Sequence, residues 1–436
     1  MGDSAPAAAA SNLIMNKLKA FLNGKSALSF VLLASLAFAT AMPHSEASEL
    51  PQATPCKQET LPLTEDEQSA LRWLDHIMGA LPAEEEKEWW NIGGRQFGLF
   101  STRYNIAFAG YAAAALGIRG NTEQRATVGR ILDNSIARYL KKNVWAYTQA
   151  KNYWGTKPWA PDPCYRENIM YTGHLLQLLA LYEAFTGDIK YWTDGFDFVW
   201  DSSKRIHYDV QKLIDVTVEQ MRTNDSGGVT CEPGLLFFPC NNHPHYALKL
   251  FAILGHGDWA ADTRRWEKWA LSHFRTPLMG GGVLNLLCHT SSGLFYPRGY
   301  SGLDAWSLLW YEPWAEERST ALELWSKSRT MLDWKKLSEP SDAIEGRNNC
   351  MNPQQVPATV LSAFLAAAAR ACDDTETAER LETPLDAKYL QRKNGFFWLE
   401  VSREWRIGAT ANRIIALAEK NGSRFREWIP NAQKAR

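Results

Sequence analysis

Two cysteines, Cys231 and Cys240, are the side chains of this sequence best suited to proton transfer or nucleophilic attack. The segment between them is apolar and holds two prolines, which predicts a rigid turn rather than a helix. A thiol can act as an acid or a base because its surroundings move its pKa over several units. The residues alone also allow an inert buried pair, a local disulfide, or zinc ligation together with His243 and His245. The zinc interpretation is weak, because the pair lacks the close cysteine spacing of zinc sites.

A histidine and an acid are the other candidates for acid–base chemistry. His174 follows Met170 by four residues in the string NIMYTGH, so a helix places both on one face. For a histidine in so apolar a segment, a core role is also open. Asp75, in the string WLDH, lies at the edge of an amphipathic helix. Two groups that donate and accept protons in a dry pocket suffice for acid–base catalysis without a cofactor.

Helical patterns recur along the chain after residue 65 and must position these side chains. The predicted helices cover residues 105–116, 121–139, 166–185, 246–254, 259–273, 303–312, 316–331, 355–371 and 409–420. Many are apolar on more than one face, which is typical of an inner ring of helices covered by an outer ring. Alternation typical of strands is brief, around 282–287 and 396–401, and predicts hairpins between helices. The sequence therefore predicts an all-α fold, an (α/α)6-type barrel (a toroid of helical hairpins) with short β-hairpin connections.

The first fifty residues have the composition of a targeting segment. An uncharged run of 16 residues, from Ala27 to Met42, follows a flank that contains three lysines. Such a run is short for a membrane-spanning helix, which needs about 20 residues, and typical of a signal sequence. We expect residues 1–50 to be a signal peptide or signal anchor with a linker, which exports or membrane-anchors a catalytic domain over residues 51–436.

The overall composition argues against one class of function and favours another. The chain carries 47 Lys+Arg and 48 Asp+Glu, a net charge of −1, whereas nucleic-acid binders need a basic surface. No segment has the glycine-rich turn of a nucleotide-binding fold. The 19 Trp, 15 Tyr and 18 Phe indicate a large core, a carbohydrate cleft or an apolar pocket.

Taken together, these strings resemble the linalool dehydratase/isomerases, enzymes that dehydrate and rearrange terpene alcohols without a cofactor. The matching strings are RENIMYTGH ending at His174, VTCEP around Cys231, CN at Cys240, YNIAF from Tyr104, and LD at Asp75. The resemblance spans about residues 65–310, and the two-cysteine segment and the NIMYTGH string are its most specific parts. It implies an α/α barrel, in agreement with the helical pattern.

The resemblance implies a role for each matching residue. The implied catalytic residues are Asp75, His174, Cys231 and Cys240, and the implied substrate-binding residues are Tyr104, Met170 and Gly302. We expect Asp75 to assist Cys231 as proton donor to the substrate hydroxyl, and His174 to assist Cys240 as proton acceptor. The reverse pairing and a transient thioether at one cysteine stay open. Free thiols, no cofactor and no metal are expected.

The chain departs from the family at several pocket positions. Two family tyrosines fall on Leu81 and Gly302 here, and the cysteines of a family disulfide are absent near Glu84 and Lys142. Protein interiors are close-packed, so the space that a lost ring leaves indicates that a ligand fills it. We therefore expect a substrate larger than a monoterpene alcohol, such as a sesquiterpenoid or a molecule with a prenyl chain.

Two other functions stay open at this point. A six-hairpin glycoside hydrolase on the same toroid would use two carboxylates, such as Asp75 and Asp304, across a cleft. A non-catalytic protein could instead bind an apolar ligand. Because pocket residues in the family come from adjacent subunits, the resemblance implies a homo-oligomer with the active site near a subunit interface. The expected partners are a small apolar terpenoid-like substrate and no nucleic acid.

Overall fold

The computed structural model describes residues 62–79, 95–96, 99–146, 161–275, 277, 279–290, 292–296, 298–343 and 356–428. The predicted leader, residues 1–50, and Leu81 lie outside the described residues. Every helix within these ranges is too short or too polar to cross a membrane.

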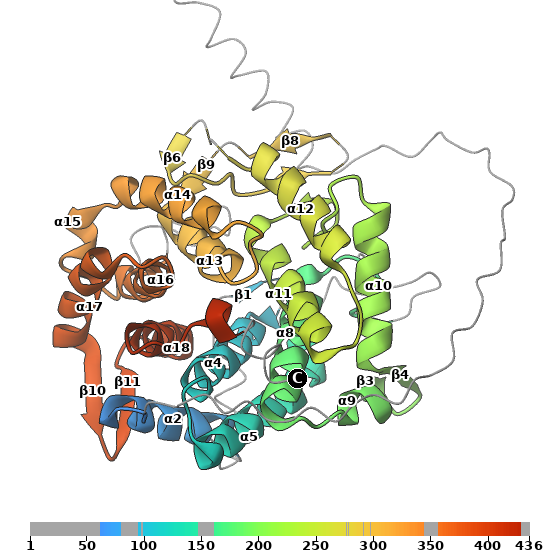
Figure 1. The fold of residues 1–436 in the computed structure, drawn as a ribbon, viewed down its shortest axis with the longest axis horizontal. Helices are drawn as coiled ribbons and strands as arrows, with labels where there is room; N and C mark the ends of the chain where they lie inside the picture. The colour runs from blue at the N-terminus through green and yellow to red at the C-terminus, as the bar shows by residue number, and fades with distance from the viewer. Residues whose placement is uncertain are drawn as a thin grey trace, which may run out of the picture. The chain divides into compact units, whose positions relative to one another are not determined.

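In the described residues, six inner helices form a closed ring in which each packs against the next (Figure 1). They are α4 (Thr102–Gly117), α8 (Ile169–Thr186), α11 (Phe238–Leu254), α13 (Ser301–Tyr311), α16 (Ala358–Ala371) and α18 (Arg403–Lys420). Contacts follow this order and return from α18 to α4. The inner helices are buried on nearly every side; in α8 all residues from Ile169 to Glu183 are buried. Their apolar composition is therefore a consequence of their place in the ring.

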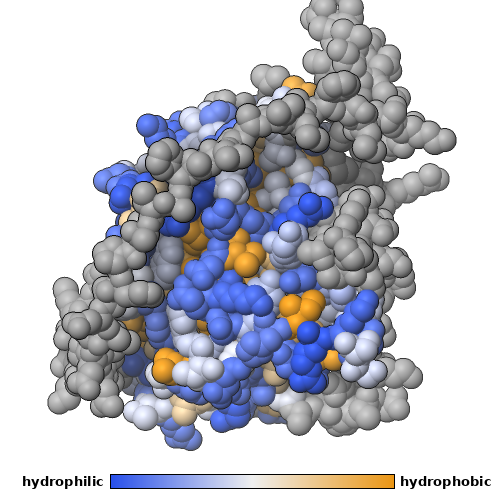
Figure 2. Space-filling model, turned by 90° about the vertical axis from the view of Figure 1, so that its right-hand side faces the viewer, coloured by the Kyte–Doolittle hydropathy of each residue, from blue (hydrophilic) through white to orange (hydrophobic). Residues whose placement is uncertain are grey.

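An outer helix precedes each inner helix in the chain. The outer helices are α2 (Glu65–Met78), α5 (Thr122–Tyr139), α10 (Val210–Thr223), α12 (Ala260–His273), α14 (Arg318–Ser328) and α17 (Thr375–Tyr389). They bury a single stripe, as α10 shows with Val210, Leu213, Ile214, Thr217, Val218 and Met221. The side of the molecule on which α10 lies is accordingly mostly hydrophilic, with a few separate hydrophobic patches (Figure 2).

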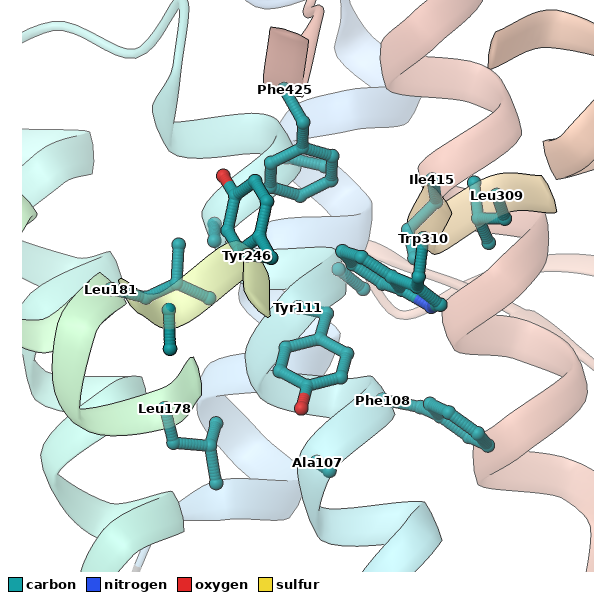
Figure 3. Close-up of a cluster of buried hydrophobic side chains, with 14 of the residues drawn as sticks. Ala107, Phe108, Tyr111, Leu178, Leu181, Tyr246, Leu309, Trp310, Ile415 and Phe425 are labelled. Atoms are coloured by element: carbon teal, nitrogen blue, oxygen red, sulfur yellow. The ribbon is translucent and has the colours of Figure 1, made fainter. Parts of the chain in front are cut away.

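The alternation of outer and inner helices gives the ring a direction. Each outer helix returns the chain, so all inner helices run the same way and their N-terminal ends meet at one end of the ring. Side chains from several inner helices fill the middle of the ring, where Tyr111 of α4 contacts Trp310 of α13 with ring centroids 4.7 Å apart (Figure 3).

Short elements connect the helices. The strands are β1 (Arg95–Gln96), β2 (Leu99–Phe100), β3 (Phe196–Asp201), β4 (Lys204–Tyr208), β5 (Leu235–Leu236), β6 (Met279–Gly281), β7 (Cys288–His289), β8 (Leu294–Phe295), β9 (Arg298–Tyr300), β10 (Leu390–Lys393) and β11 (Phe396–Leu399). All pairs are antiparallel except β6 with β9. The short helices are α6 (Lys142–Trp145), α9 (Lys190–Thr193), the 3-10 helix Arg329–Met331 and α15 (Trp334–Leu337).

The predicted toroid is confirmed, with two local corrections. The segment between the cysteines was predicted as a turn, yet α11 begins at Phe238 and includes Cys240. Pro239 is compatible with this, because the first helical turn needs no backbone N–H donor. The predicted strand at 282–287 is also wrong; there only Leu284 forms a bridge, to Arg275. The strand predicted at 396–401 is present as β11.

A buried ion pair between α16 and α17 gives a test of the outer ring. Arg370 and Glu382 are 5% and 4% exposed and form two hydrogen bonds, of 2.7 and 3.2 Å. Replacement of Glu382 by Ala leaves the guanidinium buried without its main partner, so urea unfolding should show a loss of about 3–5 kcal/mol. The matched control is Glu323→Ala, which breaks the exposed Lys327–Glu323 pair and should leave the free energy of unfolding nearly unchanged. Equal effects of the two changes would contradict this interpretation.

Candidate active site

The residues that could carry chemistry gather at the N-terminal end of the inner ring. They lie in the first two turns of five inner helices: Arg103, Tyr104 and Phe108 in α4, Met170 and His174 in α8, Cys240 and His243 in α11, Gly302 and Trp306 in α13, and Leu361 and Phe364 in α16. Helix N-terminal ends carry partial positive charge, which favours negative charge that develops there.

The two predicted cysteines meet at this end. Their Sγ atoms are 3.1 Å apart, with the Cys231 thiol donating to Cys240. This distance suits a hydrogen bond between free thiols and exceeds the roughly 2.05 Å of a disulfide. The loop with Cys231 is tied to α11 by Asn241, whose side chain accepts from the Val229 amide and donates to the Val229 carbonyl. The thiols are therefore held together by a rigid connection of loop to helix.

Burial sets the protonation of the Cys231 thiol. Both cysteines are buried, and burial, together with the hydrogen bond to Cys240, raises the pKa of the Cys231 thiol well above its usual value. Cys231 thus carries its proton at neutral pH and can donate it. Burial also raises the pKa of the Tyr104 hydroxyl well above its usual value, and the neighbouring Cys240 and Cys231 raise it further. Tyr104 is therefore a neighbour of both thiols.

His174 is held as a neutral imidazole at the same end of the ring. Its Nδ1 lies 2.8 Å from the Tyr111 hydroxyl, whereas its Nε2 is buried without a hydrogen-bond partner among the described residues. Burial, with contributions from His243 and Arg103, lowers the pKa of His174 well below its usual value. A neutral imidazole with one unused ring nitrogen can accept or deliver a proton there.

Gly173 allows α8 and α11 to approach closely at this point. A Cβ at Gly173 would come within 2.8 Å of Pro244 Cδ and 3.3 Å of the Cys240 carbonyl oxygen. Only glycine fits here without displacing α11. His174 is the next residue, so this contact sets its position relative to Cys240.

Met170 and Arg103 form a second buried contact of the site. The Arg103 guanidinium donates to Met170 Sδ over 3.5 Å, and its Cζ lies 4.4 Å from the Tyr104 ring centroid. Its charge disfavours protonation of His174 and stabilises a thiolate at Cys231. No sequence pattern indicated this arginine beyond its place next to Tyr104.

An aromatic wall adjoins His174. The ring centroid of Trp306 lies 5.4 Å from that of Tyr104 and 5.9 Å from that of Phe108, and Phe108 lies 5.4 Å from Phe364. Tyr104, Trp306 and Phe364 are only partly buried. Aromatic faces attract cations, so this wall suits an intermediate with carbocation character.

Gly302 lies one helical turn before Trp306 of this wall. The open space expected at this glycine is partly filled by a neighbouring side chain. A Cβ at Gly302 would lie 3.0 Å from Leu361 Cδ1 of α16. Leu361 therefore takes up part of the volume that the glycine leaves.

The two carboxylates considered from sequence lie elsewhere. Asp75, on outer helix α2, accepts two hydrogen bonds from Arg130, of 3.1 and 2.8 Å, and is one third exposed. A single chain thus pairs Asp75 with Arg130 and not with Cys231, contrary to the predicted pairing. Asp304 is fully buried and accepts from Ser328 and from the backbone amides of Val283 and Leu284. Burial raises the pKa of Asp304 to about 7, and its bonds are those of a loop anchor.

The two histidines considered as zinc ligands have other partners. His243 Nδ1 lies 2.6 Å from Gln177 Oε1, and His245 Nδ1 lies 3.2 Å from Thr263 Oγ1. Within the described ranges, no group of three His, Cys, Asp or Glu side chains could hold a metal ion.

The chain is similar to known proteins both in sequence and in fold. The model of the family described as linalool dehydratase/isomerase matches residues 103–405. Among solved structures, a family 105 glycoside hydrolase from C. acetobutylicum aligns with a TM-score of 0.50 and 11% identity, covering 81% of this chain and 99% of that chain. An unsaturated glucuronyl hydrolase from Bacillus sp. GL1 aligns with a TM-score of 0.46 and 13% identity, covering 83% and 98%. At such identities the first of these likenesses shows the toroid fold alone.

The buried histidines make stability depend on pH. Burial lowers the pKa of His245 to about 3, below the 6.5 of an exposed histidine, so the unfolded chain binds a proton that the folded chain does not. Stability is therefore lost as pH falls below 6.5. Between pH 7.5 and 5.5 this histidine should cost about 1.4 kcal/mol, and His245→Phe should reduce the pH-dependent loss in urea unfolding by that amount. The same loss in both proteins would show that His245 is charged in the folded state.

Proposed function

The chain belongs to the linalool dehydratase/isomerase family, and we propose that it is a cofactor-independent hydro-lyase or isomerase of isoprenoid alcohols. The observation that carries the proposal is the buried thiol pair, with Sγ atoms 3.1 Å apart, at the end of the ring where His174 leaves Nε2 unused. An acid that keeps its proton and a base that stays neutral are what dehydration requires.

The proposed reaction needs one proton in and one proton out. Cys231 gives its proton to the substrate hydroxyl, and the C–O bond breaks as water leaves. A C–H bond on the neighbouring carbon then breaks and its electron pair forms the double bond. Its proton goes to His174 Nε2, or to Cys240 while Cys240 gives its own proton to His174 Nε2. Isomerisation follows when the C–H bond stays intact and water instead adds to a different carbon of the carbocation, returning a proton to Cys231.

The contact between the thiols provides a way to reset the site. After the reaction Cys231 is a thiolate and the extra proton lies on His174. Cys240 is within hydrogen-bond distance of Cys231, so the Cys240 thiol can give its own proton to the Cys231 thiolate and take the proton of His174 in its place. The enzyme returns to its starting protonation and no redox partner is required.

The residues at this end of the ring suit an apolar substrate that reacts through a carbocation. The aromatic wall of Tyr104, Phe108, Trp306 and Phe364 presents ring surfaces beside His174. The allylic or tertiary cation that forms when water leaves is stabilised by such rings. The glycoside hydrolase alternative finds less support, because Asp75 and Asp304 are both engaged in ion pairs or anchor bonds.

A single chain leaves one implied catalytic residue away from the site. Asp75 lies one third exposed on an outer helix, whereas the cysteines are buried at one end of the inner ring. A second copy of the chain is needed if Asp75 is to assist Cys231. We therefore include in the proposal a homo-oligomer in which each site receives Asp75 from a neighbour.

Replacement of Cys231 by Ala tests the proposed acid. It should lower kcat on linalool or nerolidol by roughly 10²–10⁴-fold, which is the contribution that general acid catalysis typically makes. Product formation is measured by gas chromatography. The control is Cys372→Ala, a buried thiol at the opposite end of α16, which should keep nearly full activity. Full turnover in Cys231→Ala would refute the proposal, as would ligand binding by the wild type with no turnover of any isoprenoid alcohol.

Mixing of inactive variants tests the shared site. Asp75→Asn and Cys231→Ala should each be inactive alone, and co-expression should restore roughly a quarter of wild-type activity if neighbours supply Asp75 in a cyclic oligomer. Light scattering should show more than one chain per particle. A monomer, or a mixture that stays inactive, would contradict the shared site, and full activity of Asp75→Asn would remove that residue from the mechanism.

Competition between substrates tests the size of the pocket. We expect a higher kcat/KM for the fifteen-carbon nerolidol than for the ten-carbon linalool, since each buried CH₂ adds about 0.8 kcal/mol of binding. Leu361→Ala should increase this preference, because Leu361 fills part of the space beside Gly302. The double variant Gly302→Tyr with Leu361→Ala should reverse it. A preference for linalool that neither change alters would show that this position does not set substrate size.

A further inference from the structure

A second imidazole, His243, lies against His174 in the site. It belongs to the helix of Cys240, three residues further on, and is fully buried. The ring centroids of His174 and His243 are 3.8 Å apart, with an angle of 36° between the planes. The reaction proposed above uses one imidazole, so this second ring has no assigned task.

The hydrogen bonds of His243 fix where its proton lies. The Trp306 indole N–H lies 3.1 Å from His243 Nε2, and an indole nitrogen can only donate. His243 Nε2 must therefore accept and carries no hydrogen. Its Nδ1 then bears the hydrogen and donates to Gln177 Oε1 at 2.6 Å. His243 is thus a neutral imidazole, because a proton on Nε2 would break the bond to Trp306, and burial lowers its pKa well below the usual value.

These bonds connect three inner helices at the catalytic end of the ring. Gln177 belongs to α8, His243 to α11 and Trp306 to α13. The Tyr111 ring stacks on both imidazoles, with centroids 5.8 Å from His174 and 5.6 Å from His243, while its hydroxyl contacts His174 Nδ1. The plane of His174 is therefore held by Tyr111 and His243 together, and the edge of Trp306 is held by His243.

We propose that His243 is a positioning residue whose neutral Nδ1–H form holds His174 and Trp306 in their working orientations. His174 then directs Nε2, its one unused nitrogen, at the substrate, and Trp306 keeps its place in the aromatic wall next to Tyr104. His243 itself transfers no proton. The catalytic consequence rests on the proposed function, whereas the protonation of His243 does not.

The first experiment measures that protonation directly. Protein labelled with ¹⁵N-histidine is examined at pH 7 by NMR that correlates ring nitrogens with ring protons. His243 should show a protonated Nδ1 and an unprotonated Nε2, and its signals are identified by their loss in His243→Gln. An Nε2–H form or an imidazolium would overturn the proposal even if the enzyme's substrate were still unknown.

The second experiment measures the effect on catalysis. His243→Phe keeps a buried ring but removes both nitrogens, and should lower kcat roughly 100-fold with little change in KM, since small misplacement of reacting groups costs about that much. His243→Gln restores an acceptor for Trp306 and should recover most of the loss.

The matched control is His245→Phe. His245 is equally buried on the same helix, but its ring stacks on Trp266 and its Nδ1 bonds to Thr263, outside the site. It should retain nearly all of the kcat of the wild type, because the contacts that it loses lie outside the site. Equal losses in His243→Phe and His245→Phe, or full activity of His243→Phe, would show that His243 only fills space.

Discussion

Closure of the inner helical ring is the constraint on which the rest of the structure depends. The last inner helix, α18, packs against the first, α4, and the Asn105 side chain accepts a hydrogen bond of 3.0 Å from the Gly408 amide across that contact. Because every inner helix runs in the same direction, closure gathers their N-terminal turns at one end. Residues from 103 to 364 then share one site, although no two of the helices that supply them are adjacent in the chain.

Burial at this end sets the protonation of the two side chains that serve as acid and base in the proposed reaction. Removal from water disfavours charge on both a thiol and an imidazole, so the pKa of Cys231 rises while that of His174 falls. At neutral pH the thiol holds its proton and the histidine lacks one. The buried Arg103 guanidinium acts on the same groups and favours a thiolate once Cys231 has given up its proton. In the proposed reaction, burial within the fold thus supplies both the acid and the base.

Much of the fold could be predicted from sequence, because an inner helix must be apolar all round and an outer helix on one stripe only. The strings around His174, Cys231 and Cys240 also indicated residues that the fold brings to one end of the ring, where they form the centre of the candidate site. The roles of Tyr111 and Gln177 could not be predicted, since their contacts to histidines depend on which helices become neighbours in the ring.

Two further outcomes also depended on packing that a sequence pattern does not contain. His243 was considered only as a zinc ligand, and its bond to Trp306 of another helix gives it a different place. Asp75 matched a catalytic carboxylate, yet within one chain it pairs with Arg130. The measurement that tests the account most directly is a crystal structure with a saturated, unreactive analogue of an isoprenoid alcohol. We expect the analogue's hydroxyl oxygen within hydrogen-bond reach of Cys231 Sγ and its chain along the aromatic wall. A hydroxyl bound at Asp304, or away from both cysteines, would contradict the proposed function.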